Sequence, residues 1–230
     1  MRNTDQVIRV ICVDFGGVLA EEGFRNGLLA LGSRTSLGPQ SFFEIAQDLI
    51  YTTGYLVGKA SESDYWEAIR KHTGIKLDDI DMKMEIINRF RLRPWMLTII
   101  ESLANKGYFM VLLSDQTNWL DELDATSHFC GKFDAVFNSY HQGKSKRDAS
   151  WFIDVANILG VSTKNCLFID DNPDNVDRAS SVGFRTILFK DRKLFCKELL
   201  LFKLLTEEEI SENICGDKPN DDQHRLDNEI

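Results

Sequence analysis

Residues 7–19, VIRVICVDFGGVL, decide the fold of this chain. Residues 7–13 are rich in β-branched side chains and almost continuously apolar, as expected of a strand that is buried on both faces. Asp14 and a pair of glycines follow at once, which is typical of the point where a buried strand leaves the sheet. The stretch therefore predicts a central strand with a carboxylate at its carboxyl end.

In the rest of the chain, further apolar strands alternate with segments of helical pattern. Apolar strands are expected at 108–113, 166–169 and 186–189, with a weaker one at 135–138, and helices at 95–106, 119–127, 149–159 and 176–182. Strands that alternate with helices indicate a parallel sheet with right-handed crossovers. The sequence thus predicts an α/β fold with a Rossmann-like parallel-sheet core, whose ligands bind at the carboxyl ends of the strands.

Residues 20–93 interrupt the alternation, because their pattern is helical and carries no strand signal. We expect an inserted α-helical cap over 20–93, a core built from 1–19 and 94–205, and two hinges near Ala20 and Pro94. The acidic residues 206–230 are expected to form a disordered tail. Phe42, Phe43 and Tyr51 of the insert can face a substrate, but core packing explains them equally well.

Composition excludes several classes of function. Among 230 residues, 27 Lys and Arg against 36 Asp and Glu give a net charge of −9, which argues against nucleic-acid and anionic-membrane binding but allows a small anionic ligand. The five cysteines form no zinc pattern, and a reducing cytosol is their natural compartment. No apolar run is long enough to span a membrane, and the polar start does not resemble a signal peptide, so we expect a cytoplasmic protein.

Four loops at strand ends hold the residues that can carry chemistry: Asp14, Ser114, Lys146 and the pair Asp170 and Asp171. Carboxylates that converge with a lysine and a hydroxyl suit a site for Mg²⁺ and phosphate, because Mg²⁺ prefers oxygen ligands. A carboxylate at a strand end can also act as a nucleophile and form an aspartyl-phosphate.

Four stretches in order carry a resemblance to a known family: VDFGGVL (13–19), LLSDQTN (112–118), GKSKRD (143–148) and FIDDNPDNVDRA (168–179). They resemble the four motifs of the haloacid dehalogenase-like hydrolases over about residues 7–190. The insert resembles the cap that one subgroup carries between its first two motifs. The resemblance implies a Mg²⁺-dependent phosphatase that acts on a small phosphorylated metabolite. A monomer or a homodimer is expected, although the sequence does not determine which.

The resemblance also implies a role for each matched metal-site residue. Asp14 matches the nucleophile and a Mg²⁺ ligand, and Gly16 matches the position whose carbonyl oxygen binds Mg²⁺. Asp171 matches the metal ligand of the fourth motif, and Asp170 supports the metal directly or through water.

The phosphate-binding residues follow from the second and third motifs. Ser114 matches the hydroxyl that binds the phosphoryl group, and Asp115 follows it in the phosphate-binding loop. Lys146 matches the lysine of the third motif, with Lys144 as the alternative.

One position departs from the family pattern. Its phosphatases usually carry a second Asp two residues after the nucleophile, as a general acid and base, and this chain has Gly16 there. Loss of such a group costs ~10²–10⁴-fold in rate. Glu21, Glu22 or Asp115 could replace it, and restoring Asp at position 16 could restore turnover unless the backbone there requires glycine. A 2-haloacid dehalogenase, or a weakly active binding or regulatory protein, are the alternatives.

Overall fold

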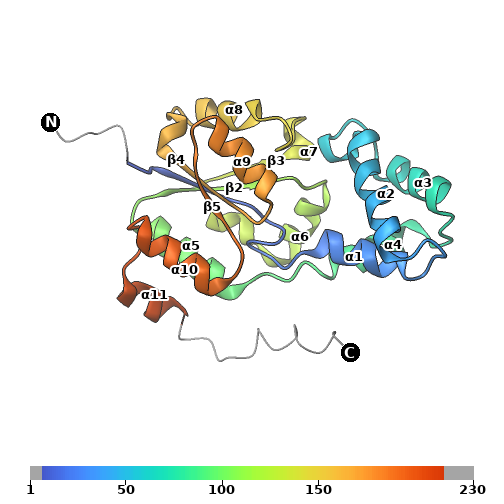
Figure 1. The fold of residues 1–230 in the computed structure, drawn as a ribbon, viewed down its shortest axis with the longest axis horizontal. Coiled ribbons are helices and arrows are strands. Elements are labelled where there is room, and N and C mark those ends of the chain that lie inside the picture. Colours follow the sequence, from blue (N-terminus) through green and yellow to red (C-terminus); the bar gives the residue numbers. More distant parts are fainter. Residues whose placement is uncertain (1–6, 215–230) are drawn as a thin grey trace.

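The computed structural model describes residues 7–214, which form a parallel five-stranded sheet flanked by helices (Figure 1). The strand order is β3-β2-β1-β4-β5, so β1 lies at the centre. The strands are β1 (Val10–Val13), β2 (Phe109–Ser114), β3 (Ala135–Asn138), β4 (Cys166–Asp170) and β5 (Arg185–Leu188). This architecture confirms the predicted α/β class, including the weak strand at 135–138.

Helices cover both faces of the sheet, as the continuous apolar character of β1 predicts. Ile11 and Val13 pack into the larger core cluster, with side chains of α5, α6 and α10. Val10 and Cys12 point to the other face, where α8 and α9 cover them. The helices of the core are α5 (Pro94–Asn105), α6 (Trp119–Ser127), α7 (Ser139–Gln142), α8 (Ser150–Ile158), α9 (Pro173–Ser181) and α10 (Arg192–Leu201).

The sheet register brings the functional strand ends together. Val13, the last residue of β1, pairs with Leu112 of β2 on one side and Ile169 of β4 on the other. The residues after these positions in β1 and β4, Asp14 and Asp170, therefore leave the sheet side by side. The predicted convergence of strand ends is a direct result of this register.

The regular elements of the insert are all helical, and it adds no strand to the sheet; an isolated β-bridge joins Ala20 and Leu92 where it begins and ends. It contains α1 (Gly23–Gly32), α2 (Pro39–Thr52), a short 3₁₀ turn (Tyr55–Val57), α3 (Glu62–Thr73) and α4 (Asp79–Ile87). Figure 1 shows these helices to one side of the sheet, where β1 leads into α1. The division of the chain into a core and a cap domain stays a prediction.

Two antiparallel segments join the insert to the core. Glu21 N–H donates to the Arg91 carbonyl at 2.8 Å, and Arg93 N–H donates to the Leu19 carbonyl at 2.9 Å. Both segments lie next to the predicted hinge positions, and each holds the other in place.

A cluster of aromatic side chains holds the insert against α6 of the core. The rings of Trp66 in α3 and Trp119 in α6 stack at 5.6 Å between centroids. The carboxylate of Glu62 accepts hydrogen bonds from both indole N–H groups at 3.1 Å. Tyr55 adds a hydrogen bond from its hydroxyl to Asn118 Oδ1 at 2.6 Å.

The expectation of a disordered tail from residue 206 is wrong for its first part. A helix, α11 (Glu207–Ile214), follows Thr206 and packs beside α5. Thr206 N–H donates to Glu209 Oε2 at 2.7 Å, and Glu209 N–H donates to Thr206 Oγ1 at 3.3 Å. This is a capping box, and the Thr-x-x-Glu pattern that specifies it is visible in the sequence. The remainder of the expected tail, 215–230, lies outside the described residues.

Two further observations concern the environment of the protein. Within residues 7–214, no helix has the length and apolar character needed to cross a membrane. Four cysteines in that range are free thiols: Cys12, Cys130, Cys166 and Cys196.

Replacing Glu62 by Ala is expected to lower the free energy of unfolding by about 2 kcal/mol, because it leaves two buried indole N–H groups without an acceptor. Glu67→Ala on the same helix is the control, since Glu67 is exposed. Urea unfolding followed by tryptophan fluorescence measures both. Equal stability of the two variants would contradict the role of Glu62.

Candidate active site

A buried lysine connects the two central strand ends. Lys146 lies in the loop between α7 and α8 and is 0% exposed. Its Nζ contacts Asp14 Oδ1 at 2.5 Å and Asp170 Oδ2 at 2.7 Å. A lysine with no access to solvent is stable in its charged form only when carboxylates surround it. The structure therefore places Lys146, the lysine preferred from the third motif, between Asp14 and Asp170, whereas its role in phosphate binding stays a prediction.

The carboxylate of Asp170 is fully engaged by its neighbours. Asn172 N–H donates to Oδ1 at 2.8 Å, and Asn175 Nδ2 lies 3.3 Å from both carboxylate oxygens. With Lys146 on Oδ2, three groups fix its orientation. Asp170 therefore acts first as the support that positions Lys146.

Asp171 completes a cluster of three carboxylates. One oxygen atom each of Asp14, Asp170 and Asp171 lies within 4.8 Å of the other two. Lys146 neutralises only part of this charge. Oxygen donors with excess negative charge are the set that binds a hard divalent cation such as Mg²⁺.

Burial governs the electrostatics of the cluster. It raises the pKa of Asp14 well above its usual value, although Lys146 opposes the shift. Burial, and then the neighbouring charge of Asp170, raises the pKa of Asp171 to about 7. Burial acts to lower the pKa of Lys146, but the carboxylates of Asp14 and Asp170 outweigh it and raise that pKa. Burial thus makes the anionic forms of these carboxylates costly, and a bound cation would stabilise them.

Some residues of the second and third motifs line the cavity, whereas others only hold the neighbouring loops in place. Asp115 Oδ1 accepts hydrogen bonds from Ser139 Oγ at 2.5 Å and from Lys146 N–H at 2.9 Å, so Asp115 holds the Lys146 loop. Ser114 is 2% exposed and does not line the cavity described below. Lys144 pairs with Asp154, away from the site. Lys146 is thus the lysine at the site, whereas phosphate binding by Ser114 and Asp115 stays a prediction.

Two adjacent glycines play different parts. Gly17 has φ +80°, and a Cβ on it would lie 2.1 Å from Asp171 Oδ2, so glycine is required both for the backbone and for the placement of that carboxylate. The φ of Gly16 lies outside the left-handed region, and a Cβ there would meet its nearest atoms at 3.4 Å. The backbone constraint that the sequence raised for position 16 therefore applies to position 17.

A cavity of about 480 Å³ opens above the carboxylates, between the core and the insert. Phe43 and Tyr51 of α2 line it, as the sequence allowed, whereas Phe42 is buried in the core. Arg147 stacks on the ring of Tyr51 at 3.3 Å from its centroid, and Arg25 lies over Phe43 at 4.6 Å. Two guanidinium groups therefore line a cavity whose floor carries carboxylates.

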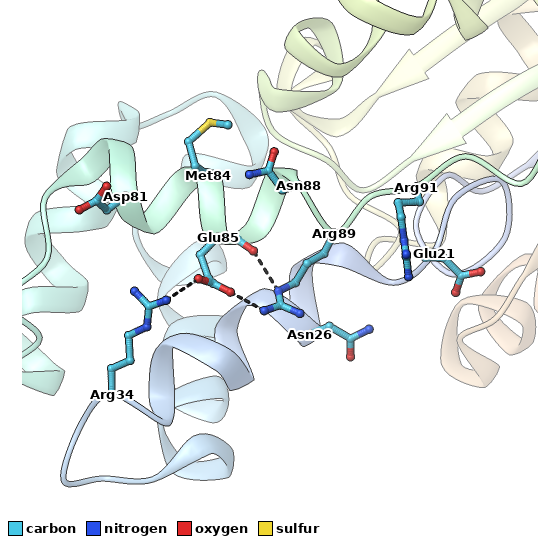
Figure 2. A pocket seen from close by; sticks show the side chains of 9 residues that line it. All are labelled: Glu21, Asn26, Arg34, Asp81, Met84, Glu85, Asn88, Arg89 and Arg91. Atoms are coloured by element: carbon cyan, nitrogen blue, oxygen red, sulfur yellow. Dashed lines mark hydrogen bonds and ion pairs between the residues drawn. The ribbon is translucent and has the colours of Figure 1, made fainter. Parts of the chain in front are cut away.

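A second cavity, of about 650 Å³, lies on the insert side of the hinge (Figure 2). It holds neither Lys146 nor the three clustered carboxylates, but Glu21, one of the acids considered for the missing general acid, lines it. Glu85 occupies it and forms ion pairs with Arg34 and Arg89. The lining as a whole carries three carboxylates and three guanidinium groups, so the cavity has no excess charge for an ionic ligand: Glu21, Asp81 and Glu85 against Arg34, Arg89 and Arg91. Chemistry is therefore assigned to the cavity above Asp14.

Three residues help to build the site in ways that sequence reasoning did not name. Gly17 places Asp171, Asn175 orients Asp170, and Arg178 donates to Asn175 Oδ1 at 3.2 Å. Asn175 and Arg178 lie in the fourth motif itself, so their spacing was visible. The sequence suggested Asp174 or Asn175 as the cap of α9, but Asn172 caps it, with its Oδ1 accepting from Asp174 N–H at 2.9 Å. The sequence shows Gly17 only as the second residue of a glycine pair. Its role could not be predicted, because the approach of Asp171 depends on the tertiary structure.

Comparison with known proteins gives a family match. A model of the haloacid dehalogenase-like hydrolases matches residues 8–183. A stretch of 85 residues, 37% of this chain, is 34% identical to drimenol cyclase drtB of Aspergillus calidoustus and covers 14% of it. A stretch of 101 residues, 44% of this chain, is 26% identical to flavin mononucleotide hydrolase 1 of Arabidopsis thaliana and covers 41% of it. The chain thus spans less than half the length of each of these relatives.

The fold is also similar to solved structures. The enzyme bt-2542 from Bacteroides thetaiotaomicron, a HAD-family protein crystallised with magnesium and inorganic phosphate, superimposes with a TM-score of 0.64 at 19% identity. The match covers 82% of this chain and 98% of that one. At this identity the likeness concerns the fold.

The two glycines give a matched pair of variants. Gly17→Ala is expected to lower the free energy of unfolding by about 1–3 kcal/mol, because alanine is strained at φ +80° and its Cβ collides with Asp171. Gly16→Ala is expected to change it by less than about 1 kcal/mol, because both its backbone and its surroundings accept a Cβ. Chemical denaturation measures the free energy of unfolding of both variants. Equal losses of that free energy would contradict the requirement for glycine at position 17 alone.

Proposed function

The chain belongs to the haloacid dehalogenase-like hydrolases, and we propose that it is a Mg²⁺-dependent phosphatase that cleaves a small phosphomonoester through Asp14. One observation carries the proposal: the buried Lys146 bridges Asp14 and Asp170 beside a third carboxylate at the carboxyl edge of the sheet. This arrangement combines a nucleophile, a fixed positive charge and oxygen donors for a cation. Phosphoryl transfer depends mainly on such positioning and charge.

The residues present fit a magnesium ion. Asp14, Asp171 and the carbonyl of Gly16 would hold it, while Asp170 supports Lys146 and faces the same cluster. When bound, Mg²⁺ would supply positive charge to the phosphoryl oxygens. The excess of carboxylates over lysine at this position supports the assignment.

The protein's own side chains supply the remaining steps. One carboxylate oxygen of Asp14 attacks phosphorus, and Lys146 holds the carboxylate in orientation through its contact with Oδ1. The Lys146 ammonium also offsets charge that develops on the transferred group. Hydrolysis of the aspartyl-phosphate then returns Asp14 to its free form.

The walls of the cavity support a small anionic substrate. Arg25 and Arg147 place positive charge on its walls, each against an aromatic ring of α2. Such charges attract a phosphomonoester toward a cavity floor that otherwise carries carboxylates. The stacked rings of Phe43 and Tyr51 fix the two guanidinium groups and leave an apolar surface for the rest of the substrate.

Flavin mononucleotide is a reasonable first substrate to test, since one relative is named for its hydrolysis. The matched region covers under half of each chain, so the substrate stays part of the proposal. The proposal also includes a cytoplasmic location, a small phosphorylated metabolite as the partner, and a monomer or a homodimer as the oligomeric state.

A 2-haloacid dehalogenase is the second candidate, and Gly16 favours it, because displacement of halide needs no proton donor for the leaving group. Against it, a cluster of three carboxylates has no evident use with an anionic haloacid. The phosphatase is therefore preferred.

A screen of phosphomonoesters, including flavin mononucleotide and p-nitrophenyl phosphate, with and without Mg²⁺ tests the function. We expect Mg²⁺-dependent release of phosphate that Asp14→Asn abolishes, because the substitution removes the nucleophile. Release of chloride from 2-chloropropionate without Mg²⁺ would favour the dehalogenase instead. Absence of both activities would favour a binding or regulatory role.

Calorimetric titration with Mg²⁺ tests the metal site. Loss of even an outer partner of a metal ligand weakens binding ~10–100-fold, so Asp171→Asn should weaken it at least about 10-fold. Asp174→Asn is the matched control, because Asp174 lies at the rim of the same cavity with a side chain 73% exposed. Equal binding by Asp171→Asn and wild type would remove Asp171 from the site.

A further inference from the structure

The proposed reaction needs a group that this chain lacks at the expected place. A carboxylic acid must protonate the departing alkoxide, and the resulting carboxylate must later take a proton from the attacking water. Gly16, at the position where relatives carry that acid, has no side chain. Three further acids line the cavity beside Asp14, Asp170 and Asp171: Glu22, Asp115 and Asp174.

We propose that Glu22 replaces the missing acid, with its carboxylate in the space that a side chain on residue 16 would occupy. A Cβ built on Gly16 would lie 3.4 Å from Glu22 Oε2, at contact distance. Glu22 belongs to the start of the insert, yet it lines the same cavity as Asp14. Gly16 and Glu22 are thus complementary: the absent side chain leaves the room into which the glutamate reaches. This inference rests on the proposed phosphatase function.

The side chain of Glu22 is held in this direction. Glu22 is the N-cap of α1, and its Oε1 accepts a hydrogen bond from Arg25 N–H at 2.8 Å. Oε2 is the oxygen next to the Gly16 position. One oxygen therefore anchors the carboxylate to a helix start while the other is presented at the site.

The adjacent Glu21 points elsewhere. Both of its carboxylate oxygens accept from Arg93, at 3.0 and 3.1 Å, in the hinge. It lines the second cavity, which Figure 2 shows, and not the cavity above Asp14. Of the two consecutive glutamates at the entry to the insert, only Glu22 faces the reaction.

The other two acids are also unsuited to the role. Asp115 uses its Oδ1 to hold Ser139 and the backbone of Lys146, and that use fixes the catalytic loop. The Asp174 side chain is 73% exposed and lies 3.6 Å from Arg178. Neither contacts the space at position 16.

The two steps balance with Glu22 as the only proton carrier. As the Asp14 oxygen bonds to phosphorus and the ester P–O bond breaks, protonated Glu22 gives its proton to the departing alcohol oxygen. Glu22, now a carboxylate, then takes a proton from water as the water oxygen bonds to phosphorus. The bond between Asp14 and phosphorus breaks, inorganic phosphate leaves, and both acids return to their starting forms.

The test compares Glu22→Gln with Glu21→Gln, its neighbour, on two esters in the presence of Mg²⁺. The glutamine oxygen can still accept from Arg25 N–H, so helix α1 keeps its cap, and circular dichroism checks the fold. With glycerol 2-phosphate, whose alkoxide needs a proton, Glu22→Gln should lose ~10²–10⁴-fold in turnover. Glu21→Gln should retain the wild-type rate.

With p-nitrophenyl phosphate, the nitrophenolate leaves without a proton, so Glu22→Gln should still form the aspartyl-phosphate. It should release one equivalent of nitrophenol rapidly and then turn over slowly, because no base activates water. A loss of packing around α1 would not produce this burst. An acid added at position 16 should also compensate once that space is vacated: Gly16→Asp in the Glu22→Ala background should recover at least about 10-fold over Glu22→Ala alone, part of the full effect of such a group.

The outcomes separate the two proposals. Wild-type protein that hydrolyses neither ester overturns the phosphatase function and the role of Glu22 with it. Activity that depends on Asp14 but is unchanged in Glu22→Gln overturns the role of Glu22 alone. If Glu22→Gln does not fold, Glu22→Asp takes its place: it keeps a carboxylate one methylene short, and unimpaired turnover of glycerol 2-phosphate by a folded Glu22→Asp overturns the role equally.

Discussion

The contact of the buried Lys146 ammonium with Asp14 and Asp170 is the interaction on which the rest of the site depends. Three ionisable groups buried this deeply are tolerable only if their charges meet at short range, since a single buried charge left unpaired costs several kcal/mol. The fold meets this condition by bringing the end of β1, the end of β4 and the α7–α8 loop to one point. Each group holds the others in place, so the same contact orients the Asp14 carboxylate and stabilises the core.

The support around this contact is built in layers. Asp115 fixes the backbone of Lys146, while Asn172 and Asn175 fix Asp170. Gly17 allows Asp171 to approach the loop after β1. Because these supports come from the loops after β1, β2 and β4, the geometry of the site is set by the sheet register and not by any one loop.

The insert brings more than a cover for the cavity. Its first residues place Glu22 beside the nucleophile loop, and α2 supplies the aromatic rings on which Arg25 and Arg147 rest. The tryptophan stack with Glu62 ties α3 to α6 of the core. Proton transfer and substrate selection would therefore depend on how the insert sits on the core, in contrast to a phosphatase whose acid belongs to the nucleophile loop.

The sequence by itself determined the α/β class, the strands and the residues that carry charge at their ends, because a strand buried on both faces and an acid at its exit are local patterns. It also contained the capping box of Thr206 and Glu209, although acidic composition suggested disorder there. Only the tertiary structure decided which lysine pairs with Asp14, which glycine tolerates a side chain, and which of two consecutive glutamates faces the cavity. These choices depend on distances between segments far apart in the chain, and neighbouring residues of the same type have no local pattern that distinguishes them.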